Sequence, residues 1–111
     1  MLDTAARLLL SPLLIYQALK VRKIAKTLPE PEGPRAGFLG TGPHLRLAII
    51  GDSSAAGVGV DHQSNALSGQ LSRLLAKEFE VSWHLDAVSG ATTQSTLQRL
   101  QSAKDTPLDI I

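Results

Sequence analysis

Residues 45–111 alternate between short apolar runs and segments with helical spacing. A helix that crosses back over a sheet brings the next strand in with the same direction, so strands joined through helices pair in parallel. This alternation predicts an α/β fold built on a parallel sheet. The expected strands are 45–50, 81–88 and 107–111, and the expected helices are 66–79 and 92–104.

Each expected element has a face that we expect to be buried. The helix 66–79 places four leucines on one side, and Ser64 or Asn65 is its expected N-cap. These leucines are Leu67, Leu71, Leu74 and Leu75. The strand 81–88 alternates, with inward residues Val81, Trp83, Leu85 and Ala87. The helix 92–104 is weaker and has Leu97 and Leu100 as its anchors.

Residues 29–44 hold four prolines and four glycines. Such a composition predicts a linker without a regular element. We therefore expect the folded domain to span 45–111. A sheet of so few strands leaves both edges open, so we expect this domain to be the N-terminal part of a larger one, incomplete at its C-terminus.

Residues 1–28 are predicted to form a helix with Asp3 as its cap and a kink or break at Pro12. A stripe made by Leu14, Ala18, Val21, Ala25 and Leu28 predicts an amphipathic helix with a basic opposite side. Two alternatives follow: peripheral contact with an anionic membrane, or packing on the protein's own domain or a partner.

The uncharged run 8–19 is shorter than the ~20 residues that span a bilayer, and no small-residue cleavage site follows it. We therefore expect no cleavable signal peptide, and favour a cytoplasmic or inner-membrane-associated location.

Composition excludes several classes of protein. The formal net charge is +1 and aromatic residues make up 4%, without basic and aromatic residues interleaved, which argues against nucleic-acid binding. The chain has no cysteine, which excludes a disulfide scaffold and thiolate metal sites. No cluster of His, Asp and Glu has metal-ligand spacing, so we expect no metal site.

Two small polar turns follow the first two expected strands: "GDSSAAGVG" from Gly51 and "SGATT" from Ser89. In open α/β sheets, ligands bind beyond the carboxyl ends of the strands. The first turn does not match the sequence motifs of the usual phosphate-binding loops, G-x-G-x-x-G and G-x-x-x-x-G-K-[ST]. A nucleophilic serine and an ordinary strand-end turn both remain open on spacing alone.

The stretch "GDSSAAGVGVD" resembles block I of the SGNH (GDSL-type) serine esterases, whose spelling G-D-S-x-x-x-G-x-G is matched at Gly57 and Gly59. "AVSGATTQSTLQRL" is similar to block II of that family. The resemblance covers about 45–111. It implies a three-layer α/β/α sandwich of flavodoxin-like type and hydrolysis of acyl esters, without a metal or other cofactor.

The resemblance also implies roles for single residues. Ser53 corresponds to the nucleophile, and its own N–H and that of Gly90 correspond to oxyanion donors. Asp52 supports the motif through hydrogen bonds, together with Gly51 and Gly57. Ser54 stands where the family name has leucine, and it competes with Ser53 for the nucleophile role.

The family also has an Asn block, G-x-N-D, and an Asp–His block, D-x-x-H, and neither is found in these 111 residues. His44, His62 and His84 are expected to be surface histidines rather than the base. We therefore expect this chain to be inactive alone. The alternative is a non-catalytic module that associates with a membrane or a partner through residues 1–28.

Overall fold

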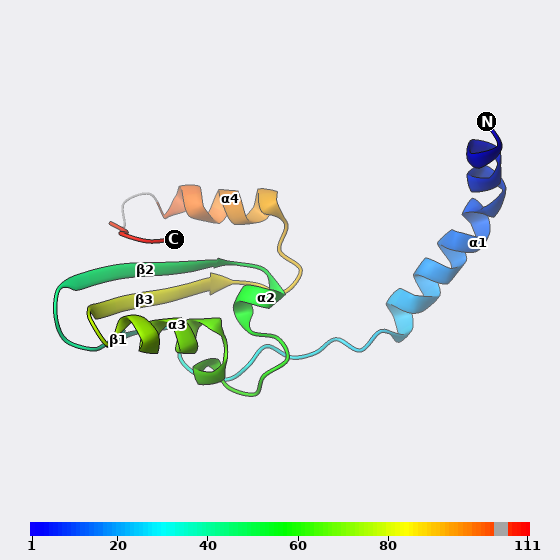
Figure 1. The fold of residues 1–111 in the computed structure, drawn as a ribbon. Coiled ribbons are helices and arrows are strands. Elements are labelled where there is room, and N and C mark those ends of the chain that lie inside the picture. The colour runs from blue at the N-terminus through cyan, green and yellow to red at the C-terminus, as the bar shows by residue number, and fades with distance from the viewer. Residues whose placement is uncertain (104–106) are drawn as a thin grey trace.

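The structure, a computed structural model, describes residues 1–103 and 107–111, without the side chain of Leu2. It is a mixed α/β fold (Figure 1). The strands are β1 (Ala36–Leu39), β2 (His44–Gly51) and β3 (Glu80–Ala87). The helices are α1 (Leu2–Ile24), α2 (Ser53–Ala56), α3 (Leu67–Leu75) and α4 (Thr93–Ser102), with a short 3-10 helix η1 (Gln63–Asn65) before α3.

The described strands form one mixed sheet in the order β1-β3-β2. β2 and β3 pair in parallel, as predicted, and their last residues, Gly51 and Ala87, are partners in the register. β1 pairs antiparallel with β3, so the prediction of a purely parallel sheet is wrong. An antiparallel strand at the edge of an otherwise parallel sheet is a common arrangement in α/β proteins.

β1 lies inside the segment 29–44, and the prediction that this segment forms no regular element is wrong. Pairing at a sheet edge uses main-chain groups, so four residues suffice without an apolar pattern. The glycine within this strand lies close over an aromatic ring. A Cβ added at Gly37 would be 3.2 Å from Nε1 of Trp83. Glycine, which suggested a loop in the sequence, therefore allows β1 to lie close to the ring of Trp83.

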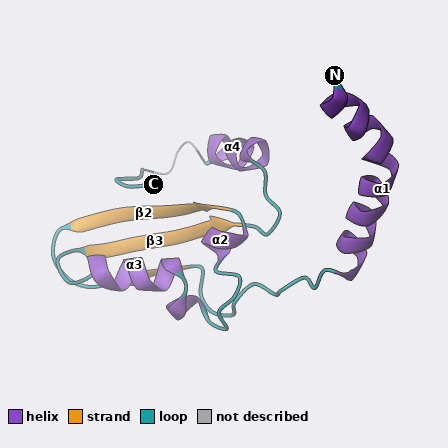
Figure 2. Cartoon of the chain, turned by 45° about the vertical axis from the view of Figure 1, so that its right-hand side comes forward, coloured by secondary structure: helices purple, strands orange, loops and turns teal. Residues whose placement is uncertain are grey.

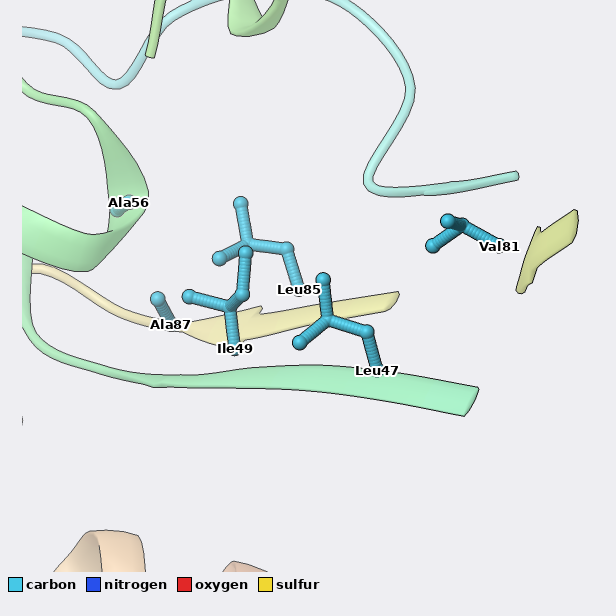
Figure 3. Close-up of a cluster of buried hydrophobic side chains, with 6 residues drawn as sticks. All are labelled: Leu47, Ile49, Ala56, Val81, Leu85 and Ala87. Carbon is cyan, nitrogen blue, oxygen red and sulfur yellow. The ribbon is translucent and has the colours of Figure 1, made fainter. Parts of the chain in front are cut away.

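One face of β2 and β3 carries the core (Figure 3). The helices α2 and α3 cover this face. The predicted alternation of β3 is confirmed, since Val81, Leu85 and Ala87 are buried and Trp83 packs against them. The complete buried cluster is Leu47, Ile49, Ala56, Val81, Leu85 and Ala87.

The buried side of α3 matches the predicted leucine face only in part, since Leu71 and Leu75 pack partly buried against the core. Ser68, Gly69 and Ser72 are buried, whereas Leu67 and Leu74 are exposed. The helix runs so close to η1 that a Cβ added at Gly69 would lie 2.5 Å from the carbonyl oxygen of Gln63. Only small residues fit such a contact. The expected caps are also wrong, because Ser64 and Asn65 belong to η1, and Ala66 precedes α3 without a side-chain cap.

α4 lies on the opposite side of the sheet from α3, as Figures 1 and 2 both show. Its N-cap Thr92 exchanges hydrogen bonds with Ser95 in a capping box, which explains why the helix begins there. Of its two predicted anchors, Leu97 is 51% exposed and Leu100 is half-buried. An ion pair of 3.0 Å between Arg99 and Asp86 joins α4 to β3. Residue 104, the end of the predicted helix, lies outside the described residues.

Residues 107–111, predicted as a third strand, begin to pair with β2. Ile110 forms a parallel bridge with Leu47, and its carbonyl oxygen accepts a hydrogen bond of 3.0 Å from the N–H of Ala48. β3 occupies the other edge of β2, so this segment adds to the free edge. The pairing has the predicted direction and position, and in the described residues it is a bridge rather than a full strand.

α1 is one helix that continues through Pro12, so the predicted break is not found, and it ends before Ala25 rather than at residue 28. Asp3 is not the cap. It lies within the first turn and forms an ion pair of 3.1 Å with Arg7.

The predicted stripe of α1 does not pack on the domain. Leu14 is 54% exposed, Val21 and Leu28 are similarly exposed, and Figure 1 shows α1 standing away from the sheet. In the described residues, no helix is long and apolar enough to cross a membrane.

Candidate active site

The first turn of the candidate site joins β2 to α2. Asp52 is the N-cap of α2, and its Oδ1 accepts a hydrogen bond of 3.0 Å from the N–H of Ser54. Ser53 is the first residue of the helix and is half-buried. Gly51 packs against the same helix, since a Cβ added there would lie 2.7 Å from Cβ of Ala55. Asp52 therefore fixes the turn through the backbone.

Gly57 ends α2 in the left-handed conformation, with φ of 88°. This conformation is costly for residues with a side chain. A Cβ at this position would also lie 2.5 Å from Cβ of Ala66, in the segment that leads into α3. Glycine is therefore required both by the backbone and by the packing, and it lets α2 stop after four residues.

The second turn follows β3 at the same edge of the sheet. The N–H of Val88 donates to the carbonyl of Gly51 at 3.2 Å, and the N–H of Ala91 donates to the carbonyl of Val88 at 3.1 Å. Gly90 is the third residue of this turn and has φ of 81°, as type II turns require. A Cβ added at Gly90 would meet nothing within 4 Å, so its surroundings are open.

The backbone N–H groups of the two turns show the same pattern. Those of Ser54, Ser89 and Ala91 donate to protein acceptors. Within the described part of the chain, the N–H groups of Ser53 and Gly90 have no acceptor. The parallel pairing of β2 and β3 thus brings two N–H groups that are free to donate to one edge of the sheet.

Two residues of the expected linker support the second turn, and the sequence analysis missed both. The carboxylate of Glu30 accepts a hydrogen bond of 2.9 Å from the N–H of Ser89 and one of 3.0 Å from Nη1 of Arg35. Arg35 also donates through Nη2 to the carbonyl of Ala87. The hydrogen bonds from Ser89, and then the charge and hydrogen bond of Arg35, lower the pKa of Glu30 from its ordinary 4.5.

No pattern in the sequence signals this support. Glu30 and Arg35 lie about 55 residues upstream of the turn they hold, among prolines and glycines. Their contacts exist because β1 pairs with β3 and brings the preceding residues to its carboxyl end.

An open cleft of about 650 Å³ lies beside the first turn, between α2 and α4. Asp52 and Ser54 line it, whereas Ser53 and Gly90 are not in its lining among the described residues. Gly90 instead borders a separate recess of about 360 Å³ that also contains Arg99. The apolar part of the cleft is lined by Ile50, Ala55, Leu67, Ala91, Leu97 and Leu100. Ser54 is therefore the serine that lines the cleft.

The three histidines belong to segments other than the two turns. Nδ1 of His62 lies 2.9 Å from Oγ of Ser64 and accepts the N–H of Ser64 at 3.1 Å, which caps η1. His84 lies in the middle of β3, and His44 begins β2, at the end of the strand opposite the turn. In the part of the chain that the structure describes, no histidine hydrogen-bonds to Ser53 or Ser54.

The described residues contain no group of three or more His, Cys, Asp or Glu placed to hold a metal ion. Comparison of the chain with protein families, with curated proteins and with solved structures finds no match. The functional argument therefore depends on the geometry of the two turns and on the sequence motifs they contain.

Proposed function

We propose that this chain carries the nucleophile and oxyanion turns of an SGNH-type serine hydrolase that acts on carboxylic esters. The observation that supports this proposal best is that the backbone N–H groups of Ser53 and Gly90 have no hydrogen-bond acceptor in the described chain. They lie on neighbouring turns at one edge of the sheet. Because neither N–H group has an acceptor, both are available to hold the oxygen that becomes negative when an acyl carbonyl is attacked.

In the proposed reaction, Oγ of Ser53 forms a bond to the acyl carbon of the ester, and the oxyanion accepts hydrogen bonds from the N–H groups of Ser53 and Gly90. The alcohol then leaves with a proton, giving an acyl-enzyme that water hydrolyses to the acid. Asp52 is not the base in this scheme, because its carboxylate accepts the N–H of Ser54 and fixes the turn.

The order of the strands supports this proposal and a flavodoxin-like sandwich. β3 lies on one side of β2, and the segment around Ile110 adds on the other side. When two right-handed connections lead to opposite sides of the same strand, their helices lie on opposite faces of the sheet. The helices α3 and α4 lie on opposite faces in this manner. The carboxyl end of β2 is then the point where the strand order reverses, which is where ligands bind in such sheets.

A serine hydroxyl needs a base to remove its proton. The resemblance implies that an Asp–His pair supplies that base and that an Asn supplies a third oxyanion donor. None of the described histidines forms a hydrogen bond with Ser53. The proposed reaction therefore needs a base and a third oxyanion donor beyond the two turns, and the test uses the full-length translation product.

The decisive experiment compares Ser53→Ala with Ser54→Ala in that product. With p-nitrophenyl acetate or butyrate as substrate, Ser53→Ala is expected to lower kcat/KM by about 10³-fold or more, whereas Ser54→Ala retains turnover. A butyryl group trapped on the peptide that contains both serines should disappear only in Ser53→Ala. The reverse result would assign the nucleophile to Ser54, and turnover that survives the loss of both serines would exclude an acyl-enzyme at this turn.

A second candidate function is a non-catalytic module that associates through its N-terminal residues. The exposed apolar side chains of α1 favour this function. It is distinguished from the hydrolase by the same assay, because a module without the catalytic set gives neither turnover nor acylation of Ser53.

A further inference from the structure

The large apolar side chains of α1 are uncovered. Each one from Leu8 to Leu19 is at least 50% exposed, and Leu9 is 81% exposed. A contiguous apolar surface of this kind on a soluble protein marks an interaction site. We refer to residues 8–19 as the apolar band.

The apolar band surrounds the helix. Leu8, Leu9 and Leu10 are consecutive, and successive residues on a helix are about 100° apart, so these three side chains already point in three different directions. The run from Leu13 to Tyr16 repeats this pattern one turn later. The predicted amphipathic stripe is therefore wrong for this part of α1. A groove on a partner protein covers one face of a helix, whereas lipid covers all of them.

The backbone of the band is satisfied internally. Pro12 has no N–H, so it cannot make the helical hydrogen bond to the carbonyl of Leu8. Oγ of Ser11 donates to that same carbonyl at 2.8 Å. In water this carbonyl would be hydrated, but in hydrocarbon a freed carbonyl is costly, and a neighbouring serine commonly satisfies it. The same hydrogen bond also satisfies the hydroxyl donor of Ser11.

The band ends at a basic cluster. Lys20, Arg22, Lys23 and Lys26 follow it, and no acidic residue occurs between Lys20 and Pro29. All four side chains are exposed. A basic cluster next to an apolar segment binds the anionic headgroups of a membrane. The charge of this end of α1 is thus complementary to the surface of an anionic bilayer.

The band is too short to cross a bilayer. Residues 8–19 extend about 18 Å along a helix, at 1.5 Å a residue, and the hydrocarbon of a whole bilayer is ~30 Å thick. We propose that α1 buries the apolar band in one leaflet of an anionic membrane and lies along its surface, so that the charged end with Asp3 and Arg7 and the basic cluster both stay at the headgroups, the cluster bound to lipid phosphates. This inference is independent of the proposed function, because α1 and the two turns are separate elements.

Flotation of the full chain with vesicles tests the proposal. Binding is expected to vesicles of phosphatidylserine mixed with phosphatidylcholine, and to be weakened by salt and by the absence of phosphatidylserine. Leu14→Glu should lower the partition coefficient at least about tenfold, because it places a charge in the band. Lys23→Gln should lower it about fivefold.

Leu74→Glu is the matched control. Leu74, on α3, is 61% exposed against 54% for Leu14, and the substitution changes the net charge equally. This variant should bind like the wild type. Equal losses in both glutamate variants would show that charge repulsion alone acts, and no loss in Leu14→Glu would exclude insertion. Either result overturns the proposal.

Because the chain has no cysteine, a single one can report the depth of insertion. A polarity-sensitive fluorophore on Leu14→Cys should shift to the blue on anionic vesicles, whereas the same label on Ser102→Cys, at the exposed end of α4, should not. Concentration-dependent self-association that Leu14→Glu abolishes, without vesicle binding by the wild type, would instead assign the band to a second copy and overturn the proposal.

Discussion

Asp52 and Glu30 have the same function on neighbouring turns. Each carboxylate accepts a backbone N–H at the carboxyl edge of the sheet, from Ser54 and Ser89 respectively. A turn that follows a strand leaves N–H groups without ladder partners, and a carboxylate accepts them strongly. These contacts occupy the N–H groups of Ser54 and Ser89, next to those of Ser53 and Gly90, which have no acceptor within the described turns.

At the residue scale, we predict that Glu30→Gln loosens the second turn. The amide replaces charged hydrogen bonds to Ser89 and Arg35 with weaker ones, so the free energy of unfolding should fall by about 1 kcal/mol. Urea unfolding followed by the fluorescence of Trp83, the single tryptophan, measures this change. Glu32→Gln, two residues away with the same change of charge, is the control. An equal effect in both variants would show that the contact with Ser89 is unimportant.

The effect of Glu30 depends on pH in a defined direction. Its pKa is lower in the folded protein than its ordinary 4.5. A carboxylate whose pKa is lowered by folding contributes its full stabilisation at a pH above its ordinary pKa. This stabilisation is lost as the pH falls through the lowered pKa. The difference in stability between wild type and Glu30→Gln should therefore shrink below about pH 4.5.

At the scale of elements, the segment 107–111 is attached to β2 by one side-chain clamp. Oδ2 of Asp109 accepts the N–H of Arg46 at 2.8 Å and its Nε at 3.0 Å, and Oδ1 accepts Nη2 at 3.0 Å. These hydrogen bonds, with the positive charge of Arg46, lower the pKa of Asp109 from 3.8 to about 2. The clamp fixes the register in which Ile110 reaches the edge of β2.

We predict that Asp109→Asn releases this segment. The N–H of Ala48, which donates to Ile110, should then exchange with solvent about tenfold faster in hydrogen-exchange measurements. The N–H groups that pair β2 with β3 serve as the internal control and should keep their protection. In the wild type, the attachment should hold above pH 3.8 and fail as the pH falls through about 2. Unchanged exchange at Ala48 in the variant would contradict a role for the clamp.

At the scale of the whole molecule, α1 and the sheet are joined by an extended segment that begins at Ala25. The contacts of the sheet region begin at Glu30, because Glu30 holds the second turn and the N–H of Glu32 donates to the carbonyl of Asp61 at 3.0 Å. The sequence predicted that the folded part begins at residue 45. These contacts show that it begins well before that residue.

We predict that brief digestion of the full chain with trypsin cuts first after exposed basic residues between Lys20 and Lys26. The bond after Arg35 should resist, because the carbonyl of Arg35 accepts the N–H of Leu85 at 2.6 Å and its side chain holds Ala87. Mass spectrometry identifies the first fragments. Early cleavage after Arg35 would show that β1 is not part of the stable sheet.

The sequence by itself determined β2, α3, β3 and α4 to within a few residues, because the apolar period is a local property. The inward residues of β3 and the parallel pairing of β2 with β3 follow from the same patterns. It also located the two turns, since small polar residues after an apolar run indicate a strand end.

Tertiary structure alone decided the rest. β1 forms because β3 offers an edge, and Glu30 reaches Ser89 only through that pairing. The buried face of α3 combines Leu71 and Leu75 with the small residues Ser68, Gly69 and Ser72, which are needed because η1 lies against the helix. Long-range contacts of this kind depend on which chain segments meet in space, and no local pattern of side chains records them.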